Sequence, residues 1–204
     1  MSLHKINHST LRDRLITIPQ EPSFLPDGTS FYSNIDPYSL SDGQECASVL
    51  EIVGLWTVVQ RQGGLQAGPF SSFLSQGQKQ LFSLARAVLK RRVRTKDQIL
   101  VSSKSRENII SGGILLVDEV SSSVDDVTER TIQTVIQREF EGYTVVMVSH
   151  RLEMVKEFDT LVVMDNGSVI ETGRPEELLR REGGAFHRVR SLSASQNQDS
   201  DNAK

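Results

Sequence analysis

A short run of aliphatic residues constrains the fold of this chain more than any other feature. Residues 114–117 are four consecutive large aliphatics, preceded by two glycines and followed by Asp118 and Glu119. The run predicts a strand buried on both faces at the centre of a parallel sheet. The two acids would then lie at the strand's carboxyl end, where open α/β sheets bind ligands. They suit a site in which one acid holds Mg²⁺ and the other polarises a water for attack on a phosphate. Taken alone, the run fits a strand ending in a polar turn equally well.

Composition excludes several classes of function. The chain has 204 residues, enough for one domain or a large part of one, and 23 basic residues against 26 acidic ones give a net charge of -3. That balance offers no general attraction to nucleic acid or anionic lipid. The single cysteine, Cys46, fits a reducing compartment. Because no apolar run approaches a membrane span and no signal peptide is evident, we expect the chain alone to be soluble.

The first polar candidate follows a strand near the start of the chain. Residues 14–18 predict a short strand that Pro19 ends, and prolines at 19, 22 and 26 keep residues 20–27 irregular. Gln20 therefore lies on a loop directly after a strand, although a solvent-exposed turn glutamine is the simpler interpretation. Residues 34–40 predict a loop, and Ser41 with Gln44 has the spacing of a capping box that starts a helix.

A second capping box, Ser75 with Gln78, starts a longer helix. Its predicted apolar stripe consists of Leu81, Leu84, Ala85, Val88 and Leu89. The start of such a helix presents unpaired amides and a positive dipole end, and Gly77 would let an anion approach. An ordinary capped helix remains the alternative. The basic and polar stretch 90–113 predicts a solvated surface loop rather than a nucleic-acid patch.

Further candidates follow the aliphatic strand. Asp125 or Asp126 can cap a helix whose buried stripe is Ile132, Val135, Ile136 and Phe140. Residues 143–148 predict another strand, which ends at His150. By itself this histidine is more typical of a structural surface residue. Beyond a helix over 151–158 and a hairpin with an Asn166-Gly167 turn, Pro175 opens a last helix, and residues 191–204 predict disorder.

The order of these features resembles the nucleotide-binding domain of ATP-binding cassette (ABC) transporters. In that family's terms, the matching stretches are the Q-loop at 18–20, the signature at 74–78, Walker B at 115–119, the D-loop at 122–125 and the switch histidine at His150. The resemblance covers residues 11–190. Within the family, residues 11–15, 35–37, 169–173 and 175–179 are similar to the second such domain of subfamily C, the multidrug-resistance-associated exporters.

The resemblance implies an α/β fold. Its core would be a truncated P-loop NTPase-like (RecA-like) core with a mainly parallel sheet, joined to an ABC α-helical subdomain. The implied parts are a core strand and Q-loop at 1–20, the α-helical subdomain at 21–92, a polar insertion at 93–113, the ATPase core at 114–190 and a disordered tail at 191–204.

The resemblance also implies the cofactors ATP and Mg²⁺ and assigns roles to residues. Glu119 would be the base for the attacking water, His150 would contact the γ-phosphate, and Asp118 and Gln20 would act on Mg²⁺ and water. Two such domains pair head to tail in the family. The residues offered to the ATP of the partner domain would be Ser75, Gln76, Gly77, Gln78 and Asp125.

Two departures from the family pattern qualify these roles. No glycine is followed by lysine, so the P-loop motif Gly-x-x-x-x-Gly-Lys-Ser/Thr is absent from these 204 residues, and we expect the chain to begin in mid-domain. The signature also has Gln76 where many relatives have glycine. The implied partners are a second nucleotide-binding domain and the transmembrane domain of an exporter, without nucleic acid. That arrangement places the chain on the cytoplasmic side of a membrane through segments outside it.

Two alternatives remain open. The chain could be a catalytically incompetent half-site that completes the ATP site of a partner through its signature. It could also be the head of a chromosome-maintenance type ATPase, which shares the signature, Walker B and D-loop. The second alternative is disfavoured because the run from Gln20 to Ser75 has no sustained heptads.

Overall fold

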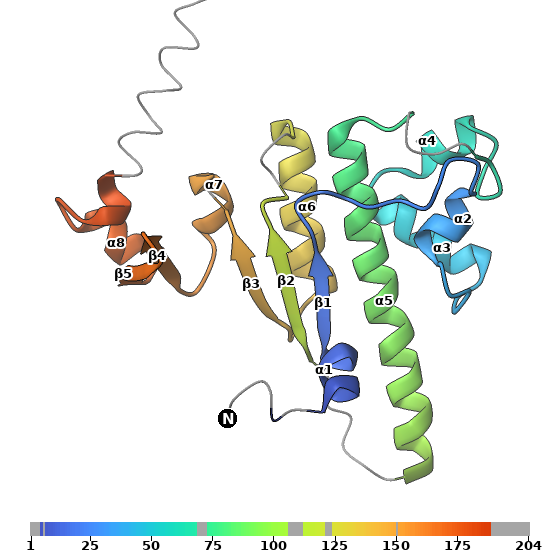
Figure 1. Cartoon of the computed structure of the whole chain (residues 1–204), viewed down its shortest axis with the longest axis horizontal. Coiled ribbons are helices and arrows are strands. Elements are labelled where there is room, and N and C mark those ends of the chain that lie inside the picture. The colour runs from blue at the N-terminus through green and yellow to red at the C-terminus, as the bar shows by residue number, and fades with distance from the viewer. Residues whose placement is uncertain are drawn as a thin grey trace, which may run out of the picture. The chain divides into compact units, whose positions relative to one another are not determined.

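The protein contains two compact units along its chain. The computed structural model describes residues 5, 7–68, 73–105, 112–120, 124–149 and 151–188. The boundary between the units lies after Val148. The first unit holds a parallel sheet with helices, and the second holds a two-stranded hairpin with short helices (Figure 1). Among the described residues, none of the helices has both the length and the apolar character that a membrane span requires.

The sheet of the first unit confirms the predicted α/β class. Its strands are β1 (Leu15–Ile18), β2 (Ile114–Asp118) and β3 (Thr144–Val148), in the order β1-β2-β3. All pairings are parallel, with Ile16 opposite Leu115 and Leu115 opposite Val145. Because the strands run the same way, their carboxyl ends meet at one edge of the sheet (Figure 1).

Two helices supply the core of this unit. Helix α5 (Gln76–Ser105) packs against β1, and α6 (Asp126–Glu139) packs beside α5. The predicted apolar stripes of both helices are buried, which confirms them. On the sheet, Ile16, Leu115 and Val117 are at most 1% exposed. One face of the sheet is therefore buried in a closely packed core.

The opposite face of the sheet differs from the prediction. Ile114, Val146 and Val148 are 38%, 47% and 56% exposed, and Leu116 is half-buried. Alternate residues of a strand point to opposite faces, so covering one face leaves the other row of side chains in solvent. The expectation of burial on both faces of β2 is therefore wrong for this chain.

Short helices fill the segment between β1 and α5. They are α2 (Phe31–Ile35), α3 (Gly43–Ile52) and α4 (Trp56–Arg61), and α1 (His8–Arg14) precedes β1. The predicted capping box at Ser41 is one residue off. Asp42 caps α3 by accepting a hydrogen bond from the Glu45 amide at 2.8 Å, while the Ser41 amide donates to Asp36 Oδ2 at 2.6 Å. Asn34, expected in a loop, is buried in α2.

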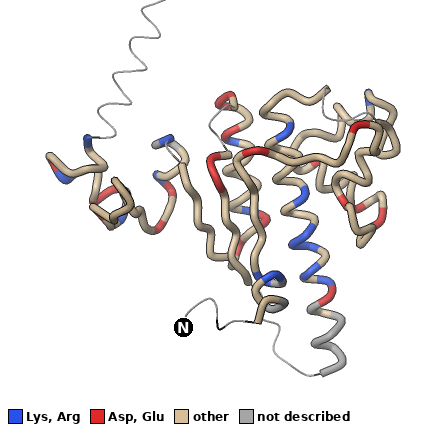
Figure 2. The backbone as a smooth tube through the Cα atoms, viewed as in Figure 1, with Lys and Arg blue, Asp and Glu red and all other residues tan. Residues whose placement is uncertain are grey.

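The basic stretch after Lys90 is helical rather than a solvated loop. Helix α5 continues to Ser105, and Figure 2 shows its basic residues gathered along the helix. Arg91 and Arg92 form ion pairs with Glu139 of α6 at 2.6 and 3.0 Å, and Arg92 also reaches Glu45 of α3 at 3.3 Å. The helix can continue because residues 90–105 contain neither glycine nor proline. The basic side chains therefore join three helices.

The Glu139 cluster should make stability depend on pH. Burial acts to raise the pKa of Glu139, but hydrogen bonds and charges from Arg92 and Arg91 outweigh it and hold the pKa below its ordinary 4.5. A carboxyl group whose pKa is lowered by folding stabilises the folded state at pH values above its unfolded-state pKa. This contribution is lost as the pH falls through the pKa of the folded state. Glu139→Gln should lower the free energy of unfolding by about 2 kcal/mol at pH 7. This value lies between those typical of surface and of buried ion pairs.

Denaturant unfolding from pH 7 to pH 3 measures this effect. The difference between wild type and Glu139→Gln should shrink as pH falls below about 4.5. Glu51→Gln, at an exposed position of α3, is the matched control and should change stability by no more than about 0.5 kcal/mol. A difference that stays constant over this pH range would contradict the ion-pair explanation.

The second unit is organised around a hairpin. Strands β4 (Leu161–Asp165) and β5 (Ser168–Gly173) are antiparallel, and Asn166 and Gly167 both have positive φ, which confirms the predicted turn. Helices α7 (Leu152–Val155) and α8 (Pro175–Arg180) belong to the same unit. The small core of this unit consists of Val155, Leu178 and Phe186. Helix α7 is shorter than the predicted helix over 151–158, and the predicted disorder over 191–204 lies outside the described residues.

Candidate functional site

Two of the predicted site residues meet at the carboxyl edge of the sheet. Gln20 lies two residues after β1, and Glu119 directly follows β2. The Gln20 Nε2 donates a hydrogen bond to the Glu119 Oε2 at 3.0 Å, although the two residues are 99 positions apart in sequence. The parallel pairing of β1 with β2 brings them together, because it places both strand ends at one edge.

The backbone of Glu119 has an uncommon conformation. Its φ is +43°, in the left-handed region that non-glycine residues rarely adopt. The Glu119 amide donates to the Val148 carbonyl at 3.0 Å, which fixes this turn to the end of β3. Strain of this kind persists only where the surrounding structure holds it, and it is frequent at functional sites.

The oxygen atoms at this edge fit a hard cation such as Mg²⁺. Asp118, the last residue of β2, is exposed. The Gln20 amide uses its nitrogen to bind Glu119, so its Oε1 remains available as an acceptor. The described residues contain no cluster of three or more ligating side chains. Mg²⁺ needs none, because it keeps several waters and takes its other oxygens from substrate phosphates.

The predicted capping box at the start of α5 is confirmed. The Gln78 amide donates to Ser75 Oγ at 3.2 Å, and the Ser75 amide donates to Gln78 Oε1 at 3.0 Å. Gln76 is exposed, whereas Gly77 is buried. A side chain at Gly77 would meet Thr128, whose hydroxyl lies 3.4 Å from the place that a Cβ would occupy. That distance is at the edge of ordinary van der Waals contact, so packing leaves room for a Cβ at Gly77, and the predicted contact of Gly77 with an anion stays a prediction.

Asp125 caps the neighbouring helix α6, as predicted. Its carboxylate accepts hydrogen bonds from the amides of Thr128 and Val127 at 3.0 and 3.1 Å, and from the Thr128 hydroxyl at 2.8 Å. The bonds from Thr128 are the main reason that the pKa of Asp125 lies below its ordinary value. Because Thr128 also lies against Gly77, the first turns of α5 and α6 pack against each other.

Sequence reasoning missed two polar residues of α5 that hold the loop after β1. Gln80 Nε2 donates to the Gln20 carbonyl at 2.5 Å. Arg86 donates to the Ser23 carbonyl and stacks on the rings of Phe24 and Phe82, at 4.9 and 5.1 Å from their centroids. Burial lowers the pKa of Arg86 to about 10, so it stays charged at neutral pH. The sequence feature that could have revealed them is the position of both polar residues among the apolar residues of the helix.

Part of the predicted site lies outside the described residues. These positions are His150, assigned to the γ-phosphate, and Ser122 and Ser123 of the D-loop. Next to His150, the Arg151 amide donates to Ser149 Oγ at 3.0 Å. The roles of all these residues stay predictions.

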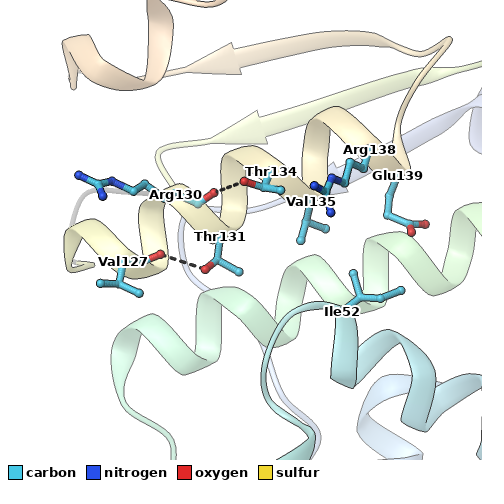
Figure 3. Close-up of a pocket in the computed structure, with 8 residues that line it drawn as sticks. All are labelled: Ile52, Val127, Arg130, Thr131, Thr134, Val135, Arg138 and Glu139. Carbon is cyan, nitrogen blue, oxygen red and sulfur yellow. Dashed lines mark hydrogen bonds between the residues drawn. The ribbon is translucent and has the colours of Figure 1, made fainter.

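A groove of about 480 Å³ lies along α6 (Figure 3). Its lining residues are Ile52, Val127, Arg130, Thr131, Thr134, Val135, Arg138 and Glu139. The two threonine hydroxyls bind backbone carbonyls of α6, at 2.9 and 2.8 Å. Glu139 is engaged by arginines of α5. The groove contains none of the predicted site residues, so the candidate site is the sheet edge with the helix start at Ser75.

Known proteins resemble this chain over most of its length. It is 48% identical over 193 residues to "ABC-type transporter braE" of Annulohypoxylon truncatum, covering 95% of the chain and 13% of that protein. It is 49% identical over 187 residues to "ABC transporter FGM5" of Gibberella zeae, covering 91% of the chain and 12% of that protein. No protein-family model matches the chain. The chain thus spans about an eighth of the length of these relatives.

A solved structure shares the fold. The chain is similar to a structure titled "Structure of a bacterial Atm1-family ABC exporter with ATP bound", with a TM-score of 0.73 and 24% identity. The similarity covers 93% of this chain and 30% of that one. At this identity the likeness establishes the fold alone. Over nearly its whole length, the chain is therefore a homologue of one part of proteins named ABC transporters, and it has the α/β fold of part of an ABC exporter.

Proposed function

We propose that this chain is the ATP-binding part of an ABC transporter, and that it couples ATP binding and hydrolysis to export of a substrate across a membrane. The observation that carries the proposal is the Gln20–Glu119 hydrogen bond at the carboxyl edge of the sheet. Support comes from the relatives, which are named ABC transporters. The similarity of several segments to subfamily C extends the proposal to an exporter of that group.

In the proposed reaction, Glu119 is the general base. Its carboxylate accepts a proton from the water that attacks the terminal phosphate, and the amide of Gln20 holds the carboxylate in place. Asp118 and Gln20 Oε1 would hold Mg²⁺. The bound ion would offset the negative charge of the phosphates. We assign contact with the γ-phosphate to His150 because it follows β3 in the chain, as Glu119 follows β2.

The helix start at Ser75 serves a second domain in this proposal. Capped α5 presents amides and the positive end of its dipole to an anion. Ser75, Gln76, Gly77 and Gln78, together with Asp125, would then face the ATP held by a partner domain in a head-to-tail pair. Gln20, on its loop, would face the transmembrane part of the transporter.

A second candidate function is a half-site without hydrolysis of its own. The observation that favours it is the complete capping box at Ser75 in a sequence where no glycine is followed by lysine. Such a chain would bind ATP weakly alone and would complete the ATP site of a partner domain. Both candidates use the same helix start, so one experiment tests what they share.

The test is ATP-dependent association with a complete ABC ATP-binding domain, measured by analytical ultracentrifugation. We expect a heterodimer with ATP and none without it. Ser75→Asp keeps a good helix cap but adds a negative charge next to the expected phosphate. Two like charges about 4 Å apart repel by about 4 kcal/mol at an effective dielectric constant of about 20. Association should therefore weaken by about 10²- to 10³-fold.

The matched control is Ser30→Asp. Ser30 also caps a helix, α2, and accepts a hydrogen bond from the Ser33 amide at 3.0 Å. The same chemical change at this cap should leave association unchanged. An equal loss of association in both variants, or association that does not depend on ATP, would contradict the proposed role of Ser75. Tight binding of labelled ATP by the isolated chain would rule out the half-site candidate.

A further inference from the structure

The loop after β1 is held by side chains of α5. Gln80 donates to the Gln20 carbonyl at 2.5 Å, and Arg86 donates to the Ser23 carbonyl. Arg86 also donates to the Asn34 carbonyl at 2.6 Å, and the Leu25 amide donates to Asn34 Oδ1 at 2.9 Å. Helix α5 therefore holds this loop at Gln20 and at Ser23, although the loop has no regular structure of its own.

Gln80 connects these contacts between α5 and the loop to the candidate base, Glu119. Its amide nitrogen binds the carbonyl of Gln20, and the side-chain amide of the same residue binds Glu119 at 3.0 Å. Gln80 lies five positions after the cap at Ser75, in the same rigid helix. A chain of two hydrogen bonds thus runs from the first turns of α5 to the carboxylate of Glu119.

The environment of Gln80 is unfavourable for a residue with only a packing role. The residue is 3% exposed, and its Oε1 is a buried acceptor with no hydrogen-bond partner in the described part of the chain. An unsatisfied buried oxygen destabilises a fold, and an apolar side chain of similar size would avoid that cost. The amide nitrogen, by contrast, has a specific partner in Gln20.

We propose that Gln80 is a positioning residue, which sets the place of Glu119 through Gln20. A shift of the start of α5 would move the Gln20 carbonyl with it and change the Gln20–Glu119 hydrogen bond. The catalytic part of this inference rests on the proposed function. In that case, about a turn and a half of α5 links the partner's nucleotide at Ser75 to the chain's own base, Glu119. Arg86 holds the same loop three residues further on, at Ser23.

The test replaces Gln80 with methionine, which has similar length and no hydrogen-bond donor. In the isolated chain at pH 7, NMR would follow the side-chain amide protons of Gln20 and the chemical shift of the Glu119 side-chain carboxylate carbon (Cδ). We expect Gln80→Met to speed exchange of the Gln20 amide protons by at least about 10-fold and to move the Glu119 Cδ resonance. The thermal midpoint should stay the same or rise, because the unsatisfied oxygen is removed. Gln60→Met, at an exposed position of α4, is the matched control.

A double-mutant cycle separates positioning from packing. If Gln80 acts through Gln20, then Gln80→Met should have no further effect on the Glu119 Cδ resonance in a Gln20→Ala background. Should Gln80→Met unfold, Gln80→Leu provides the same readouts. Unchanged Gln20 exchange and an unchanged Glu119 Cδ resonance in the folded variant would overturn the inference. These readouts need no ATP, so they stand even if the proposed function fails.

Kinetics then test the link to turnover, in the chain joined downstream of a P-loop segment from a relative. Gln80→Met should lower kcat by about 10- to 100-fold, as expected for loss of a supporting contact, and leave KM for ATP nearly unchanged. A fall in kcat that only matches the loss of folded protein would indicate that Gln80 has a structural role only. A moved Glu119 Cδ resonance together with no turnover in the unaltered protein would instead reject hydrolysis by this chain while preserving the positioning role.

Discussion

Glu119→Gln should lower ATP turnover by about 10²- to 10⁴-fold, the contribution typical of a general base. The chain is tested downstream of a P-loop segment from a relative, so that it holds its own nucleotide. Glutamine still accepts the hydrogen bond that Gln20 donates at 3.0 Å, so the geometry of the site should persist. It cannot take a proton from water. Phosphate release under saturating ATP measures turnover, and equilibrium binding of a labelled nucleotide should be unchanged.

The control for this prediction is Glu141→Gln, the same change at an exposed turn after α6. Turnover of that variant should match wild type. If Glu119→Gln hydrolysed ATP at an undiminished rate, the base would have to be another group. If nucleotide binding were lost as well, Glu119 would act in binding rather than in proton transfer.

Phe82→Ala should destabilise the first unit by about 3–5 kcal/mol, the range for a fully buried phenylalanine. Phe82 is 0% exposed, and its ring lies 5.7 Å from that of Phe24 and 6.4 Å from that of Phe31. Removing the ring leaves a cavity and takes away a surface on which Arg86 stacks. For a unit of this size, the thermal midpoint should fall by about 8–16 °C. Calorimetry or circular dichroism measures the shift.

Phe73→Ala provides the comparison for Phe82. Phe73 is 54% exposed, so the same truncation there should change stability by no more than about 0.5 kcal/mol. Comparable losses at both positions would show that the aromatic cluster around Phe82 is not a core. A loss at Phe82 below about 1 kcal/mol would contradict the close packing on which this prediction rests.

The parts of the fold that local chemistry determines could be predicted from the sequence. The strand before Asp118, the cap at Ser75 and the turn at Asn166 each follow from a few neighbouring residues. The cap before α3 was misplaced by one residue because Ser41 and Asp42 are both good caps, and only the contact of Ser41 with Asp36 decides between them.

Long-range contacts account for what the sequence did not reveal. The basic residues after Lys90 suggested a solvated loop, because their partners Glu139 and Glu45 are more than 40 residues away. Burial of β2 was overestimated because an aliphatic run shows what a strand can bury and not what covers it. Gln80 was overlooked for the same reason, since its partner Gln20 lies 60 positions earlier.

The left-handed backbone at Glu119 bears on how this position changes in evolution. Glycine adopts that conformation without strain, and asparagine or aspartate does so more readily than glutamate. Selection for stability alone would therefore replace the glutamate. If Glu119 is the proposed base, a related chain with glycine or asparagine at this position should lack hydrolysis.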